Sequence, residues 1–137
     1  MSKNIGILVG SLRKDSLNKI VAKKLAELFP SDSTVTFIEI GDLPIYNEDL
    51  EANAPESYTR FRKEMKEQDA YVFITPEYNR SMPALLKNAI DVGSRPWGES
   101  VWPGKPVLVG SVSPSGISGA LANHQIRQSL VFGDSPV

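Results

Sequence analysis

The sequence predicts an α/β fold in which a doubly wound parallel sheet forms the middle of three layers, with helices on both faces. Two observations support this. Short apolar runs do not alternate with polar residues, as in strands buried on both faces, and stretches of helical periodicity lie between them. The resulting order is β-α-β-α-β-α-β-α, with connections short enough for crossovers. No repeat or linker divides the chain, so we expect a single domain over residues 1–137.

Three buried strands are predicted at residues 5–9, 71–74 and 107–109, each with a Gly or Pro close to an end. A further run, residues 34–40, alternates polar and apolar side chains over its first half. This is typical of a strand with one wetter face, at an edge of the sheet. Ligands of doubly wound sheets bind at the carboxyl ends of the strands, so the loops that follow the strands are the candidate site.

The first two predicted helices precede and follow the edge strand. The first begins at Leu17 and is stopped by Pro30. Its apolar stripe comprises Leu17, Ile20, Val21, Leu25, Leu28 and Phe29. The second spans about residues 55–66, and its inner stripe is Tyr58, Phe61 and Met65.

The third and fourth helices follow the last two strands. Ser81 is the expected N-cap of the third, with Pro83 in its first turn and Gly93 at its end. Its inner face carries Met82, Leu85, Leu86, Ala89 and Ile90. The fourth follows Ser118-Gly119 and turns Ala122, Ile126 and Leu130 inward.

Composition excludes several classes of function. The chain has 15 basic and 16 acidic side chains, which gives no general positive field for nucleic acid or an anionic membrane. No apolar run approaches the ~20 residues that span a bilayer, and no signal-peptide pattern opens the chain, so we expect a cytoplasmic protein. The absence of cysteine excludes disulfides, thiolate metal sites and cysteine nucleophiles.

The first strand joins the first helix through the segment Gly10-Ser11-Leu12-Arg13-Lys14-Asp15-Ser16-Leu17-Asn18. A helix N-terminus at this position offers unpaired backbone N–H groups and the positive end of the helix dipole, which favour a phosphate. Ser11, Ser16 and Asn18 add donors, and Arg13 adds a full charge. The segment is neither a Walker loop nor a Gly-x-Gly-x-x-Gly turn. An ordinary β-α loop with a serine cap is the alternative.

Two further strand ends have a similar character. The third strand is followed by Pro76-Glu77-Tyr78-Asn79-Arg80-Ser81-Met82-Pro83, where two prolines bracket an acid, an aromatic ring and an amide. The fourth is followed by Ser111-Val112-Ser113-Pro114-Ser115-Gly116-Ile117-Ser118-Gly119. Each segment alone also fits an ordinary turn with a packed tyrosine or a helix cap. Together, the three strand ends predict one site for a flat, phosphorylated ligand.

Other candidate groups receive no role. The lone His124 has no serine nucleophile motif beside it and suits a surface or packing position. Glu48, Asp49 and Glu51 lack metal-ligand spacing and are interpreted as a solvated turn. Trp97 and Trp102 lie in the Pro-rich stretch 96–106, interpreted as one surface loop, where they shield either a pocket or a subunit interface.

The motif Gly10-Ser11-Leu12-Arg13 with Ser16 and Asn18, combined with Pro76-Glu77-Tyr78-Asn79, Ser81, Pro83 and Leu86-Lys87-Asn88-Ala89-Ile90-Asp91, is specific. It resembles the NADPH-dependent FMN reductase family, particularly its quinone and chromate reductase branch, essentially end to end. The resemblance implies a flavodoxin-like fold with strand order 2-1-3-4-5. Family members usually continue for another strand and helix, so the last βα unit is expected to be missing here and the fourth strand to form an exposed edge. We hypothesise that a partner subunit covers that edge or that the chain is a fragment.

The resemblance assigns the FMN phosphate to Ser11, Arg13, Ser16 and Asn18, with Leu17 as a further contact. It places the flavin ring against Pro76, Glu77, Tyr78 and Asn79, largely through backbone amides. Asn79 would lie near N5 and O4 of the ring, and Ser113 near its pyrimidine edge. Ser115 and Ser118 stand where a glycine is common in the family. No catalytic side chain and no metal is expected, because the flavin does the chemistry.

The resemblance also implies an NAD(P)H oxidoreductase, in which hydride passes from NADH or NADPH to FMN and then to quinones, free flavin, azo compounds or metal oxyanions. Family members are commonly oligomers, so we expect a homodimer or homotetramer. A non-enzymatic flavodoxin-type electron carrier or FMN-binding sensor is the alternative; it would bind FMN and oxidise NADPH negligibly. A low-molecular-weight phosphatase is excluded because it requires a cysteine.

Overall fold

The computed structural model describes residues 2–137, in which four strands alternate with four α-helices. The strands are β1 (Asn4–Val9), β2 (Thr34–Phe37), β3 (Ala70–Thr75) and β4 (Val107–Ser111). The helices are α1 (Leu17–Ala26), α2 (Glu56–Lys66), α3 (Ala84–Gly93) and α4 (Ala120–Phe132), and a short 3-10 helix, η1 (Glu48–Leu50), precedes α2. The predicted order of elements and the α/β class are confirmed.

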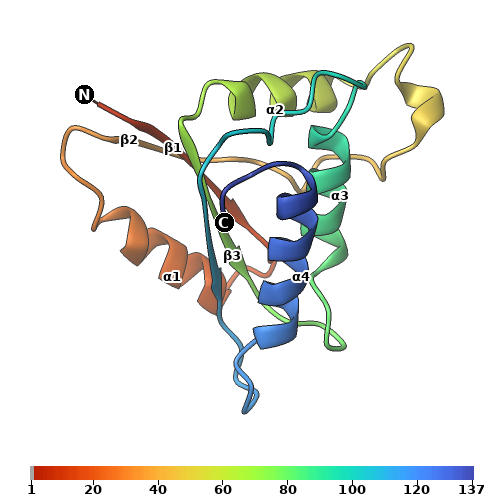
Figure 1. The fold of residues 1–137 in the computed structure, drawn as a ribbon. Helices are drawn as coiled ribbons and strands as arrows, with labels where there is room; N and C mark the ends of the chain where they lie inside the picture. The colour runs from red at the N-terminus through yellow and green to blue at the C-terminus, as the bar shows by residue number, and fades with distance from the viewer. Residues whose placement is uncertain (1) are drawn as a thin grey trace.

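All strand pairs are parallel and follow the order β2-β1-β3-β4. This is the order of the first four strands in the flavodoxin-like fold, and it confirms β2 as an edge strand. Helix α1 covers one face of the sheet, and α2, α3 and α4 lie on the other (Figure 1). None of the helices described over residues 2–137 has the length and apolarity needed to cross a bilayer.

The outer edge of β4 ends the sheet, and within residues 2–137 no fifth strand pairs with it. Two contacts cover part of this edge. The backbone N–H of Val107 donates to the carbonyl of Pro136 at 2.8 Å, and Asn123 Nδ2 of α4 donates to the carbonyl of Val109 at 3.0 Å. The carboxyl-terminal tail therefore lies beside the start of β4, so this edge is less open than the sequence suggests.

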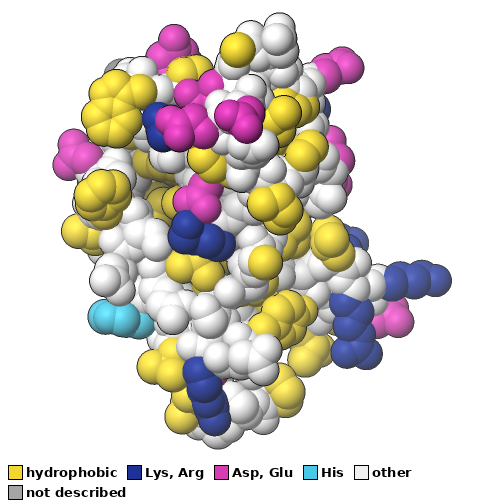
Figure 2. Space-filling view, turned by 90° about the vertical axis from the view of Figure 1, so that its right-hand side faces the viewer, with side chains coloured by type: hydrophobic (Ala, Val, Ile, Leu, Met, Phe, Trp, Pro, Cys, Tyr) yellow, Lys and Arg dark blue, Asp and Glu magenta, His cyan; other side chains and the backbone are white. Residues whose placement is uncertain are grey.

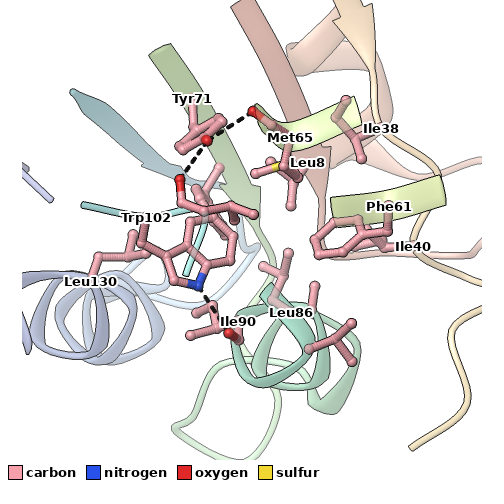
Figure 3. Close-up of a cluster of buried hydrophobic side chains, with 14 of the residues drawn as sticks. Leu8, Ile38, Ile40, Phe61, Met65, Tyr71, Leu86, Ile90, Trp102 and Leu130 are labelled. Atoms are coloured by element: carbon pink, nitrogen blue, oxygen red, sulfur yellow. Dashed lines mark hydrogen bonds between the residues drawn. The ribbon is translucent and has the colours of Figure 1, made fainter. Parts of the chain in front are cut away.

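The main core lies between the sheet and helices α2, α3 and α4, and Trp102 lies near its centre (Figure 3). The Trp102 ring is 1% exposed, packs edge-on against Tyr71 with ring centroids 5.5 Å apart, and donates its indole N–H to the Ile90 carbonyl at 3.0 Å. The Tyr71 hydroxyl donates to the carbonyls of Met65 and Val101. The prediction of one surface loop at residues 96–106 is therefore wrong at Val101 and Trp102, which are core residues.

The predicted inner faces of α2 and α4 are confirmed. Tyr58, Phe61 and Met65 of α2 are buried, and so are Ala122, Ile126 and Leu130 of α4. The edge strand β2 ends at Phe37 and is shorter than predicted. Ile38 still donates its N–H to the Ile7 carbonyl at 2.9 Å, and Ile38 and Ile40 are buried in the main core.

The opposite face of the sheet is covered by α1. Helix α1 ends at Ala26, before the residue that the sequence predicts. Ala22 and Leu25 of the helix, and Phe29 beyond its end, pack in the cluster on this face of the sheet. The apolar stripe that helical spacing identifies is only partly buried, since Leu17 and Ile20 are each 55% exposed and Leu28 is 80% exposed. Helical spacing identifies an apolar stripe, but it does not tell what covers the stripe.

Candidate functional site

The three loops that follow β1, β3 and β4 converge at the carboxyl ends of the strands, at the bottom of Figure 1. They are loop 10–16, loop 76–83 and loop 112–119. Gly10 N–H donates to the Ile74 carbonyl at 2.8 Å, and Val112 N–H donates to the Thr75 carbonyl at 2.9 Å, so the ladder continues into each loop. A Cβ at Gly10 would lie 2.6 Å from Leu86 Cδ1 and 3.1 Å from Pro76 Cδ. Only glycine therefore lets the start of loop 10–16 approach loop 76–83 and α3 this closely.

Loop 10–16 and the first turn of α1 present a run of free backbone donors. Within residues 2–137, the N–H groups of residues 11 to 18 donate to no protein acceptor. The positive end of the α1 dipole lies at the same place. Arg13 is exposed and forms no ion pair with any described residue. Free N–H groups, a helix N-terminus and an unengaged guanidinium together favour an anion such as a phosphate.

The polar side chains predicted for this loop are held in place by the fold. Ser11 is 5% exposed and Ser16 is 3% exposed. Ser16 is the N-cap of α1, and its Oγ accepts the Lys19 N–H at 3.3 Å, which leaves its own hydroxyl proton available to a ligand. Ser16 can therefore cap α1, as in the ordinary β-α loop that was the alternative prediction, and still contact a ligand. Leu17, the first residue of α1, is exposed.

Asn18 connects loop 10–16 to loop 112–119. Its Nδ2 donates to the Val112 carbonyl at 3.3 Å, so this donor is directed at the neighbouring loop and not at the place predicted for a phosphate. Its Oδ1 is buried without a protein partner. A buried acceptor without a donor is costly, and it can be satisfied by a ligand hydroxyl but not by a phosphate oxygen.

Loop 76–83 contains a tight turn between Tyr78 and Ser81, whose backbones exchange two hydrogen bonds of 3.1 and 2.9 Å. Both central residues, Asn79 and Arg80, have positive φ, at 51° and 62°. That backbone is favourable for few residues besides glycine and asparagine. It leaves the N–H groups of Asn79 and Arg80 without a protein acceptor among the described residues. Pro76 is buried below the turn, and Tyr78 is 52% exposed.

Ser81 does not cap α3, so that prediction is wrong. Pro83 occupies the N-cap position, and the helix starts at Ala84 without a side-chain cap. The Ser81 hydroxyl instead donates to Gln125 Oε1 of α4 at 2.7 Å, and Met82 N–H donates to the same oxygen at 2.9 Å. Pro76 and Pro83 restrict the backbone of the loop, and the Ser81 side chain contacts α4 instead of capping α3.

The Glu77 side chain is 4% exposed and also reaches α4. Its Oε2 accepts the backbone N–H groups of Leu121 at 3.0 Å and Ala122 at 3.3 Å, and its Oε1 accepts from Arg80 at 3.0 Å. Burial alone would raise the pKa of this carboxyl, but the bonds from Ala122, Arg80 and Leu121 outweigh it and hold the pKa below its ordinary value. The sequence pointed to the backbone of Glu77 and missed this use of its carboxylate.

Loop 112–119 is small and polar. Ser113 is half-buried, and its Oγ donates to Ser115 Oγ at 3.2 Å and accepts the Ser115 N–H at 3.3 Å. Ser118 has a φ of 50° and Gly119 a φ of 82°. Ser118 therefore adopts a backbone that glycine accommodates more easily.

Charge is distributed unevenly on the face that Figure 2 shows. Acidic side chains gather in its upper part, and most basic side chains lie in its lower half, toward the three loops. A hollow of about 910 Å³ lies elsewhere, between α3, α4 and the segment that follows α3. Trp97 and Trp102 both line it, but none of the predicted site residues does. Polar groups that converge on a ligand identify a site better than volume does, so we place the functional site at the three loops.

These features fit the FMN that the resemblance implies. The donors of residues 11 to 18 match its phosphate, the buried Asn18 Oδ1 matches a hydroxyl of its ribityl chain, and the free N–H groups of Asn79 and Arg80 match acceptors on its ring. His124 is exposed and lies outside the three loops.

Comparison with known proteins shows the family of the chain. The family model described as NADPH-dependent FMN reductase matches residues 3–137. A quinone reductase of Pseudomonas putida is 60% identical over 134 residues, which cover 97% of this chain and 72% of that protein. A 2-hydroxy-1,4-benzoquinone reductase of a Burkholderia species is 46% identical, over 98% of this chain and 73% of that protein.

A solved structure of a flavoenzyme is similar over almost the whole chain. The flavoenzyme NAD(P)H:(acceptor) oxidoreductase FerB of Paracoccus denitrificans is 44% identical and superposes with a TM-score of 0.90, over 98% of this chain and 74% of that one. The flavodoxin-like fold is thus confirmed, in a chain shorter than its relatives, and so are FMN as cofactor and NAD(P)H as electron donor. On its matched length and these similarities, the chain belongs to the NADPH-dependent FMN reductase family.

Proposed function

We propose that residues 1–137 form a single FMN-binding domain that uses NAD(P)H to reduce quinone-type electron acceptors. The run of free N–H groups at residues 11 to 18, joined to two further loops at the same sheet end, is the observation that carries the proposal. The quinone reductase names of the relatives support the class of acceptor.

In this proposal the phosphate of FMN is bound by the backbone of loop 10–16 and by the start of α1. Arg13 supplies the full positive charge, and Ser11 and Ser16 supply hydroxyl donors. Leu17 contributes its backbone N–H, since its side chain is exposed. Asn18 has its donor on Val112, so we assign its free Oδ1 to the ribityl chain rather than to the phosphate.

The flavin ring is assigned to the surface between loop 76–83 and loop 112–119. Tyr78 offers a half-exposed aromatic face, and the backbone donors around Asn79 can bind polar atoms of the ring. Pro76 and Ser113 border the same surface. Bound FMN supplies the hydride and electron transfer. The chain's residues therefore bind, orient and stabilise charge, and no side chain is required as a general acid or base.

We further propose that free flavin, azo compounds and metal oxyanions serve as electron acceptors besides quinones. We expect a homodimer or homotetramer that acts in the cytoplasm, away from membranes and nucleic acid.

Titration of the purified full chain with FMN, followed by anaerobic addition of NADPH, tests the proposal. We expect saturable FMN binding, then loss of the visible flavin absorbance within seconds, and its return when a quinone is added. A protein that binds FMN but does not react with NADPH would instead be an electron carrier or sensor. A protein that binds no FMN would contradict the proposed site.

A further inference from the structure

Hydrogen bonds to side chains of both segments join loop 76–83 to helix α4. Glu77 of the loop sends its carboxylate to the N–H groups of Leu121 and Ala122 in the first turn of α4. Gln125 of α4 sends its amide oxygen back to the Ser81 hydroxyl and the Met82 N–H. We call Glu77 and Gln125, with these partners, the loop–helix clamp. It joins loop 76–83 to the helix that follows loop 112–119, and the flavin ring is assigned between these two loops.

Helix α4 depends on this contact because its own N-terminus has no side-chain cap. Its N-cap residue is Gly119, which offers no side-chain acceptor to the first-turn N–H groups. Glu77 supplies that acceptor from a segment more than 40 residues earlier in the chain. Loop 112–119 leads directly into this helix end, so its course is fixed by a residue of loop 76–83.

The Glu77 carboxylate is well suited to this task and poorly suited to direct contact with a ligand. It is 4% exposed, and both of its oxygens are engaged by protein donors. Arg80, its ion-pair partner, is a central residue of the Tyr78–Ser81 turn, and its φ of 62° is unfavourable for an arginine. The ion pair is thus one of the contacts that hold the turn in this conformation.

We propose that Glu77 is a positioning residue, whose buried carboxylate fixes loop 76–83 and the start of α4 in one arrangement for the flavin ring. This inference rests on the proposed FMN site. This role of the Glu77 carboxylate is separate from the contact between the Glu77 backbone N–H and the ring that the resemblance implies. The carboxylate also brings a negative charge to the positive end of α4, and a negative charge close to a flavin disfavours its reduced, anionic form.

Three variants test the clamp. Glu77→Ala removes both oxygens, Glu77→Gln keeps one acceptor but removes the charge, and Gln125→Ala removes the reciprocal half. Glu56→Gln is the matched control, because Glu56 is an exposed acid in the first turn of α2, away from the three loops. The measurements are the Kd of FMN, the midpoint potential of the bound flavin, and amide exchange of Leu121 and Ala122 in the FMN-free protein.

We expect Glu77→Ala to raise the Kd of FMN about tenfold, with partial recovery in Glu77→Gln, in line with the loss of bonds to a charged group. Both variants should shift the midpoint potential to more positive values, and the control should shift neither quantity. A purely structural role would lower only the thermal stability, and an unchanged Kd and potential in both Glu77 variants would overturn the inference. If the wild-type chain binds no FMN, the proposed function fails. In that case unchanged exchange at Leu121 and Ala122 in Glu77→Ala would refute the clamp separately, and accelerated exchange would support it.

Discussion

At the amino-terminal ends of β3 and β4, Trp102 is enclosed by aromatic and aliphatic side chains and its indole N–H is paired. At the carboxyl ends of the same strands, backbone donors are free, and Asn79, Arg80 and Ser118 have positive φ. One end therefore supplies stability, and the other carries unsatisfied groups and strain. Strained, unpaired groups persist where a ligand or the surrounding fold holds them, which supports our assignment of the functional site to the second end.

The largest effect should come from the stabilising end. We expect Trp102→Ala to reduce the free energy of unfolding by about 3–5 kcal/mol, because it leaves a cavity in the main core. Denaturant titration of the purified chain measures this loss. Trp97→Ala is the matched control, since Trp97 is 87% exposed and should change stability by less than about 0.5 kcal/mol. Equal effects of the two substitutions would remove the contrast between the ends.

At the functional end, we expect Arg13→Ala to weaken FMN binding by about 1.5–3 kcal/mol, since it removes a charge-assisted contact with the phosphate. Its effect on unfolding in the absence of FMN should be small, because Arg13 is exposed and makes no ion pair with a described residue. Fluorescence titration with FMN measures the change. Lys14→Ala, a neighbouring charge in the same loop, is the control. An Arg13 variant that binds FMN like the wild type would contradict the phosphate assignment.

The strain at this end should be relieved by a single substitution. Ser118→Gly is expected to stabilise the FMN-free chain by about 0.5–1 kcal/mol, because glycine adopts positive φ without the steric cost that serine incurs. Ser115→Gly provides the comparison, since Ser115 is not in the positive-φ region and also loses its bond with Ser113. Thermal unfolding of both variants should show shifts of opposite sign. A destabilised Ser118→Gly would mean that the strain is not significant.

The smallest effect at neutral pH concerns the titration of Glu77. Its pKa in the folded chain lies below the ordinary value of 4.5, mainly because two backbone N–H groups and Arg80 bind the ionised form despite its burial. The ionised carboxylate therefore stabilises the fold fully above about pH 4.5, and this contribution is lost as the pH falls through the lower, folded pKa. We expect the stability difference between wild type and Glu77→Gln to shrink on acidification. A difference that stays constant down to pH 3 would contradict the shifted pKa.

The sequence predicted the parts of the fold that follow from local pattern. Short apolar runs without alternation identified the buried strands of the parallel sheet, and period-3.6 spacing identified the buried faces of α2 and α4. It failed where the partner is distant in the chain. Ser81 looks like a helix cap because serine precedes a helix, but its hydroxyl bonds Gln125, 44 residues away. Trp102 was assigned to a surface loop because prolines and glycines surround it, although its ring fills the core.

The candidate site likewise contains features that local sequence predicts and contacts that it does not predict. A Gly-Ser-x-Arg segment between a strand and a helix predicted free donors, and residues 11 to 18 carry them. The bond from Asn18 to Val112 and the capping of α4 by Glu77 join residues 94 and 44 positions apart. Spacing within a single sequence contains no information on such pairs, so only the three-dimensional fold shows them.

The contrast between Trp97 and Trp102 has a practical use. These are the chain's two indole fluorophores, 87% and 1% exposed. Iodide in solution should quench the emission of the first and leave that of the second unaffected until the core opens. Intrinsic emission therefore reports global unfolding through one ring, with the other as an internal reference, and no extrinsic dye is needed to follow the folded population.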